Sequence, residues 1–201
     1  MHTERKMNKE AIKWRRFVLW AVLLVFCSLT AALLGRPSVP AYGQAHASFA
    51  LRSASFSDGG SIPRQYTCDG ADLSPQLAWQ PAPAGSRSFA LVMDDPDASS
   101  DFTHWLLWNL SPLERELAEG ASTRGGLPAG AVEGANDFGR RGYGGPCPPR
   151  GNPHRYFFTL YALDRRLDLP AGATRKQLEA AMSGHVLAQG QIVGAYRRAG
   201  P

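Results

Sequence analysis

Residues 139–156 read Gly-Arg-Arg-Gly-Tyr-Gly-Gly-Pro-Cys-Pro-Pro-Arg-Gly-Asn-Pro-His-Arg-Tyr and lead into an apolar run at residues 157–162. Glycine reaches backbone angles that other residues avoid, and proline fixes its own. Five glycines and four prolines therefore predict a shaped loop that places His154 and Arg155 at the entrance of a strand. Such a stiff loop suits the wall of a pocket for a small polar or anionic ligand, although a plain surface turn is the alternative.

Short apolar runs between Gly, Pro, Asn and Asp surround this loop from about residue 48 onward. Residues 88–94, 104–110, 155–163 and 191–196 are rich in β-branched and aromatic residues, which favour strands. Their spacing predicts a mainly β domain, built as an antiparallel β-sandwich. Residues 111–136 are expected to form a long excursion that includes a short helix.

One helix is predicted after Thr174. Thr174 and Gln177 match a capping box, and Gly184 fits the position just past the end of the helix. Leu178, Ala181 and Met182 can then share one apolar face.

The net charge of +5 belongs to the N-terminal part of the 201-residue chain. Residues 1–47 carry seven basic and two acidic residues, whereas residues 48–201 carry fifteen of each. The second part therefore has no overall charge that would draw it to nucleic acid, and no nucleic-acid partner is expected.

A basic start, an uncharged apolar run at residues 17–34 and small residues at 41–47 follow the order of a secretory signal. An uncleaved membrane anchor is the alternative, because eighteen apolar residues can span a bilayer. We therefore expect residues 1–47 to be a signal peptide or anchor plus linker, and residues 48–201 to be the domain. The domain would be periplasmic or secreted, or held outside the cytoplasm by the anchor, with the N-terminal segment as its only contact with the membrane.

Removal of the leader would also remove Cys27 and leave two cysteines, Cys68 and Cys147. An even number of cysteines in an oxidising compartment makes a Cys68–Cys147 disulfide a hypothesis. The sequence leaves this open, because it does not show whether the two sulfur atoms meet.

The candidate binding residues come from two separate stretches. Asp95 and Asp97 follow the predicted strand 88–94, and a strand–loop–strand of this length can bring one of them near His104. His154, Arg155 and the backbone amides of the glycine-rich loop can hold phosphate oxygens, whereas the carboxylates attract an ammonium group. The set suits a zwitterion such as a phosphoethanolamine head group better than a simple anion. An exposed Asp-Pro-Asp turn, with Arg155 only neutralising an aspartate, is the alternative.

Several motifs then resemble a known family. Residues 90–98 (ALVMDDPDA), His104-Trp105 and residues 144–149 (GGPCPP) with His154-Arg155-Tyr156 resemble the phosphatidylethanolamine-binding protein family. The closest likeness is to its bacterial and archaeal branch, the Raf-kinase-inhibitor-like proteins, which residues 66–75, 136–139 and 184–188 also resemble. The resemblance covers residues 49–197 in order.

This resemblance implies a β-sandwich with a few short helices and a small anion-binding cavity. The pocket residues of the family correspond by motif to Asp95, Asp97, His104, Gly145, Pro146, His154 and Tyr156. One departure is Ser99, which stands where the family often has a second proline.

Together these features predict an exported, non-catalytic binding protein without a cofactor or metal. Its expected ligand is a phosphate-containing or zwitterionic head group, and a protein partner in an inhibitory or signalling role is a further expectation. A metal-assisted phosphate-ester hydrolase using Asp95, Asp97, His104 and His154 is one alternative, because these side chains can ligate metals. A protein-interaction module with a vestigial cavity is the other.

Overall fold

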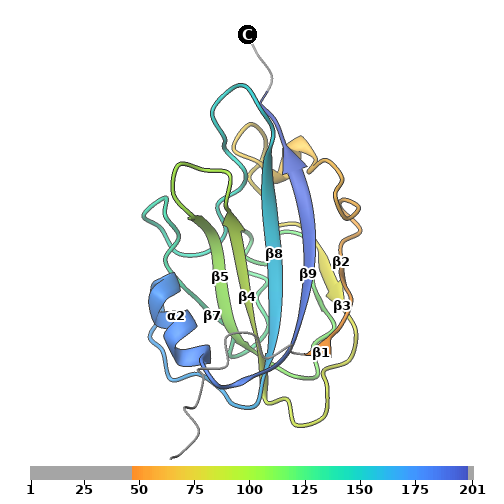
Figure 1. The fold of residues 1–201 in the computed structure, drawn as a ribbon, viewed down its shortest axis with the longest axis vertical. Helices are drawn as coiled ribbons and strands as arrows, with labels where there is room; N and C mark the ends of the chain where they lie inside the picture. The colour runs from red at the N-terminus through yellow and green to blue at the C-terminus, as the bar shows by residue number, and fades with distance from the viewer. Residues whose placement is uncertain (1–46, 199–201) are drawn as a thin grey trace, which may run out of the picture. The chain divides into compact units, whose positions relative to one another are not determined.

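The computed structural model describes residues 47–198, which fold around a six-stranded sheet (Figure 1). Cys27 and residues 1–46 of the predicted N-terminal segment lie outside the described residues, whereas residue 47 belongs to the first strand. All neighbouring strands of this sheet are antiparallel except β1, which runs parallel to β9. In spatial order the strands are β1 (Ala47–Ser48), β9 (Val186–Tyr196), β8 (His154–Leu163), β4 (Ser88–Asp95), β5 (Phe102–Leu110) and β7 (Val132–Glu133).

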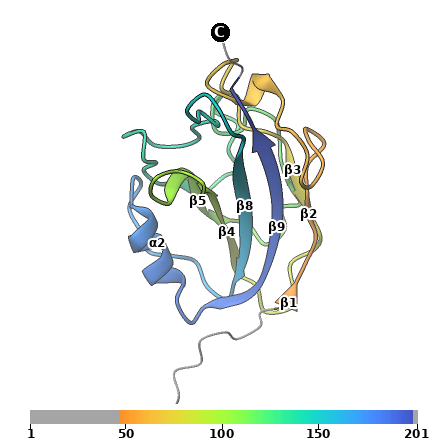
Figure 2. The same ribbon diagram turned by 45° about the horizontal axis from the view of Figure 1, so that its top comes forward.

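A second, smaller sheet and one α-helix complete the domain. The small sheet is antiparallel and consists of β2 (Leu51–Arg52), β3 (Leu77–Trp79) and β6 (Glu116–Leu117). Within residues 47–198 the helices are α2 (Arg175–Met182) and a 3-10 turn, η1 (Arg64–Tyr66). Figures 1 and 2 show α2 and the pair β2 and β3 at opposite sides of the large sheet. Among residues 47–198, no helix is long and apolar enough to cross a membrane.

The core lies on both faces of the large sheet. Side chains alternate along β4, so Phe89, Leu91 and Met93 point to the face that the small sheet covers. There they share one hydrophobic core with Leu77, Trp79 and Leu117 of the small sheet. Ala90 and Val92 face the other way and pack with Leu178 and Met182 of α2. Burial on both faces explains why residues 89–93 form an unbroken apolar run. The predicted mainly β, antiparallel sandwich is thus confirmed.

The predicted helix is also confirmed. Thr174 caps α2 through a capping box with Gln177, and Gly184 follows the helix with a φ of 79°. The expected short helix in residues 111–136 is wrong, because this segment contains only β6 and β7. Gly120, Gly125 and Gly130 take positive φ there, and each such turn interrupts a helix.

The register of the large sheet brings three strand ends together. Asp95 at the end of β4 lies opposite Phe102 at the start of β5, and Asp94 lies opposite Phe157 near the start of β8. Residues far apart in the sequence therefore meet where these three strands end, at one end of the sheet.

Candidate functional site

A cavity of about 530 Å³ opens where these strand ends meet. Two carboxylates and two imidazoles share it with apolar side chains. The lining residues are Asp95, Asp97, Ala98, Ser99, Phe102, His104, Phe138, Cys147, Pro148, Pro149 and His154. Two hairpin ends that are distant in the sequence thus converge on a single recess.

Asp95 is the buried centre of this arrangement, with only 3% of its surface exposed. One carboxylate oxygen, Oδ1, accepts hydrogen bonds from the backbone N–H groups of Asp97 and Ala98, at 2.9 and 3.1 Å. The other, Oδ2, lies 2.8 Å from Nδ1 of His154. Through Oδ1, Asp95 shapes the acidic turn as an Asx turn. Through Oδ2, it orients the His154 ring.

The hydrogen bonds of the two histidines leave one nitrogen of each ring unused. A carboxylate and a carbonyl can only accept, so Nδ1 carries the proton both in His154, facing Asp95, and in His104, 2.7 Å from the carbonyl oxygen of Gly144. The Nε2 atoms make no hydrogen bond among the described residues. Each Nε2 can therefore serve a ligand.

His104 is enclosed, and its electrostatics differ from those of a surface histidine. Burial lowers the pKa of the His104 imidazole, although the hydrogen bond to Gly144 opposes the shift. The rings of Phe102, Phe138 and Tyr156 surround it at centroid distances of 5.1, 5.2 and 5.1 Å. Neutral His104 thus offers an acceptor beside aromatic faces, a combination that attracts an ammonium group.

Asp97 and Arg155 form a forked ion pair at the rim. Arg155 donates from Nε and Nη2 to the two carboxylate oxygens at 2.9 and 2.7 Å, and its backbone N–H adds a third bond at 2.9 Å. The hydrogen bonds from the Arg155 side chain lower the pKa of Asp97 to about 2. Arg155 does not line the cavity, and its guanidinium neutralises the Asp97 carboxylate. This is the alternative role of Arg155 that the sequence left open.

Three other predicted residues also lie behind the lining. The N–H of Gly145 donates to Oδ1 of Asp72 at 2.7 Å, and the carbonyl of Pro146 accepts from the N–H of Cys68 at 3.2 Å. Gly144 donates its N–H to the carbonyl of His104 at 2.9 Å, so these loop amides are already used within the protein. Tyr156 is fully buried, and its hydroxyl has no partner among the described residues.

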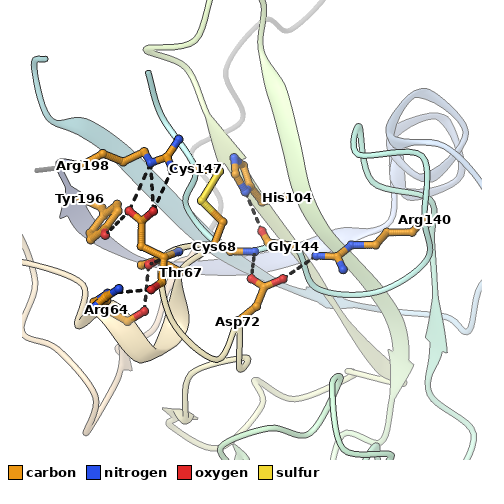
Figure 3. The surroundings of a disulfide bond; sticks show 12 residues. Arg64, Thr67, Cys68, Asp72, His104, Arg140, Gly144, Cys147, Tyr196 and Arg198 are labelled. Atoms are coloured by element: carbon orange, nitrogen blue, oxygen red, sulfur yellow. Dashed lines mark hydrogen bonds and ion pairs between the residues drawn. A yellow bond between two sulfur atoms is a disulfide. The ribbon is translucent and has the colours of Figure 1, made fainter. Parts of the chain in front are cut away.

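The wall that carries Cys147 is joined to the segment around η1. Cys68 and Cys147 form a disulfide, shown in Figure 3. Asp72 holds both the N–H of Gly145 and, at 2.6 Å, the guanidinium of Arg140. Gly145 packs directly against the backbone of residues 66 and 67, where a side chain would find no room. These contacts fix the cavity wall to a segment about 75 residues earlier in the chain.

Several lining residues were not predicted. Phe102, Phe138, Pro148 and Pro149 are among them and give the cavity apolar walls. Phe138 is 41% exposed, an unusual state for a large aromatic residue that no local pattern in the sequence reveals. Among residues 47–198, no group of three or more His, Cys, Asp or Glu side chains is arranged to hold a metal ion.

Comparisons with known proteins agree with this fold. The sequence model of the family described as Phosphatidylethanolamine-binding protein matches residues 52–197. A UPF0098 protein from Methanothermobacter thermautotrophicus is 50% identical over 149 residues, covering 74% of this chain and 98% of the relative. A UPF0098 protein from Aquifex aeolicus is 50% identical over 151 residues, covering 73% and 86%.

Solved structures are similar too. A putative phosphatidylethanolamine-binding protein homolog from Chlamydia trachomatis superimposes with a TM-score of 0.68 at 38% identity, covering 76% of this chain and 99% of its own. YbcL of E. coli, described as a new member of the mammalian family, gives a TM-score of 0.72 at 32% identity, covering 76% and 100%. The chain belongs to the phosphatidylethanolamine-binding protein family, and this membership supports a binding protein.

Proposed function

We propose that this protein is an exported, non-catalytic binding protein whose cavity takes a zwitterionic phosphate-containing head group of the phosphoethanolamine type. The observation that carries the proposal is the Asp95–His154 pair at 2.8 Å, in one cavity with His104 and two phenylalanine rings. The aromatic rings and the Nε2 acceptor of His104 favour the ammonium end of such a ligand. A protonated His154, whose charge Asp95 balances, can donate from Nε2–H to the phosphate end.

Binding by the family in general includes phospholipid head groups and proteins. A protein partner that gives the chain an inhibitory or signalling role is therefore a second element of the proposal. Export is supported by the order of residues 1–47 and by the disulfide, which persists in oxidising compartments.

The test is an NMR titration that follows the imidazole signals of His104 and His154. Phosphoethanolamine should bind more tightly than ethanolamine or inorganic phosphate, because only the whole zwitterion satisfies both ends of the cavity. His154→Ala should weaken phosphoethanolamine binding by about tenfold, the cost of one charge-assisted hydrogen bond.

His185→Ala is the matched control. His185 pairs with Asp164 at 2.9 Å, much as His154 pairs with Asp95, but it lies outside the cavity. Equal affinities for the zwitterion and its two halves, or equal effects of the two histidine substitutions, would contradict the proposal. Turnover of a phosphate ester that depends on His104 or Asp95 would favour the hydrolase instead.

A further inference from the structure

A second recess of about 370 Å³ lies beyond the disulfide-linked wall of the cavity. Four guanidinium groups and a single carboxylate surround it, which gives its lining a surplus of positive charge. The lining residues are Arg64, Asp69, Arg150, Tyr196, Arg197 and Arg198. We call this group the arginine recess.

Asp69 holds two of these arginines in place. Arg198 donates from Nε and Nη2 to the Asp69 carboxylate at 3.1 and 2.9 Å, and the Tyr196 hydroxyl adds a bond of 2.7 Å. Arg64 donates from Nε to the backbone carbonyl of Asp69 at 2.7 Å. Figure 3 shows Arg64, Tyr196 and Arg198 gathered around this point. The recess is therefore organised before any ligand arrives.

The recess retains many unused donors. Arg64 engages only its Nε, and Arg198 leaves its Nη1 without a hydrogen bond among residues 47–198. The guanidinium groups of Arg150 and Arg197 are exposed and make no hydrogen bond within the same part of the chain. Guanidinium forks match the oxygen geometry of phosphate, so these donors suit an oxyanion rather than a cation.

The recess and the head-group cavity share one segment. Cys147, Pro148 and Pro149 line the cavity, and the next residue, Arg150, lines the recess. On the other side of the disulfide, Asp69 of the arginine recess directly follows Cys68. In the view of Figure 3, Tyr196 and Arg198 lie on one side of the disulfide and His104 on the other.

From this arrangement we propose that the arginine recess is a second binding site, specific for a phosphate group, at the same end of the domain as the cavity. The site uses residues that the cavity does not use, so it stands whether or not the cavity takes phosphoethanolamine. The phosphate can be a free ion or part of an anionic lipid head group, since the chemistry of the recess is the same for both.

The experiment uses the full chain carrying His154→Ala, so that cavity binding is weakened. Inorganic phosphate is titrated while the Nε–H signals of Arg64 and Arg198 are followed by NMR. These signals should shift in a saturable manner. Adding Arg150→Gln together with Arg197→Gln should weaken the binding by about tenfold or more, because charge-assisted donors are lost.

A control with the same change in charge is Arg52→Gln together with Arg124→Gln. Both residues are exposed and outside both recesses, so this variant reports only the general loss of two positive charges. The proposal is overturned if phosphate does not shift the Nε–H signals. It is also overturned if the two double variants lose the same affinity.

A third arm assigns the source of the phosphate. Co-sedimentation with phosphatidylglycerol vesicles, compared with phosphatidylcholine vesicles, is measured for the original chain and both double variants. Sedimentation that requires Arg150 and Arg197 assigns the site to an anionic lipid surface. Saturable binding of inorganic phosphate without such sedimentation assigns it to a free anion.

Discussion

The two cavity histidines differ in what surrounds them, and this sets what each can do. His154 is 15% exposed at its side chain and faces a carboxylate, whereas His104 is buried against a carbonyl and aromatic rings. A protonated His154 is compensated by Asp95 at 2.8 Å. Protonation of His104 has no comparably close partner, so this histidine remains the neutral acceptor of the pair.

His104 should therefore titrate below 6.5, its ordinary pKa. Between the lowered pKa and 6.5 the unfolded state binds more protons than the folded state, so the free energy of unfolding falls as pH drops below 6.5. Imidazole NMR gives the titration midpoint, and melting curves at pH 7 and pH 5 give the loss of stability. A midpoint at or above 6.5 would show that burial does not control this residue.

The forked pair at the rim leads to a second expectation. Arg155→Gln removes the hydrogen bonds that hold the pKa of Asp97 at about 2, so this pKa should rise toward its ordinary value of 3.8. Carboxyl ¹³C NMR during an acid titration measures the shift. Arg140→Gln, which removes the partner of Asp72 instead, should leave Asp97 unchanged.

The positions of residues along the strands explain which site residues could be predicted from the sequence. Asp95, Asp97, His104 and His154 stand at or next to strand ends, where polar residues are easily recognised, and all four line the cavity. Adjacent residues of a strand point to opposite faces of the sheet, so the Arg155 side chain points away from the cavity that His154 lines. Gly145 and Tyr156 support the lining from behind, a depth that no one-dimensional pattern records.

At the scale of elements, the cavity wall depends on a cross-link between segments 79 residues apart. Replacing Cys68 and Cys147 by alanine should lower the free energy of unfolding by about 2–4 kcal/mol, because the unfolded chain loses its closed loop. Binding of phosphoethanolamine should also weaken, since Pro148 and Pro149 follow the freed Cys147. Denaturant unfolding and the NMR titration measure the two effects.

Cys27→Ala is the control, because Cys27 takes no part in the disulfide. A thiol assay on the unreduced protein checks the premise. Two reactive thiols in residues 48–201 would rule the bond out.

Strand β9 shows a different kind of dependence. A Cβ at Gly194 would meet Ile62 at 2.5 Å and Phe56 at 2.9 Å, because the segment that contains them crosses this strand closely. Gly194→Ala should therefore cost about 1–3 kcal/mol of stability through overpacking. Gly126→Ala, whose Cβ would find its nearest neighbour at 3.6 Å, is the matched control. Equal melting temperatures for the two variants would show that β9 can move to accommodate the methyl group.

At the scale of the whole molecule, the sequence was most informative where burial is two-sided. The apolar run of β4 and the capping box of α2 are each visible in a short stretch of sequence, so this strand and this helix could be predicted. The pairing of two-residue strands such as β6 and β7 was not, because such strands exist only through their partners. The arginine recess likewise unites residues from three distant segments.

The pairing of β1 with β9 has a consequence for maturation of the proposed leader. Ala47 and Ser48 pair with Ala188 and Gln189, so β1 covers one end of β9. This pairing adjoins the two stretches of the proposed leader that resemble an A-x-A cleavage site, residues 41–43 and 45–47. A signal peptidase cut after Gly43 would preserve both paired residues of β1, whereas a cut after Ala47 would remove one of them and leave Ala188 unpaired on that side. We therefore expect the mature mass to correspond to the earlier cut, so that the export machinery leaves the outermost strand of the sheet shielded against pairing with other chains.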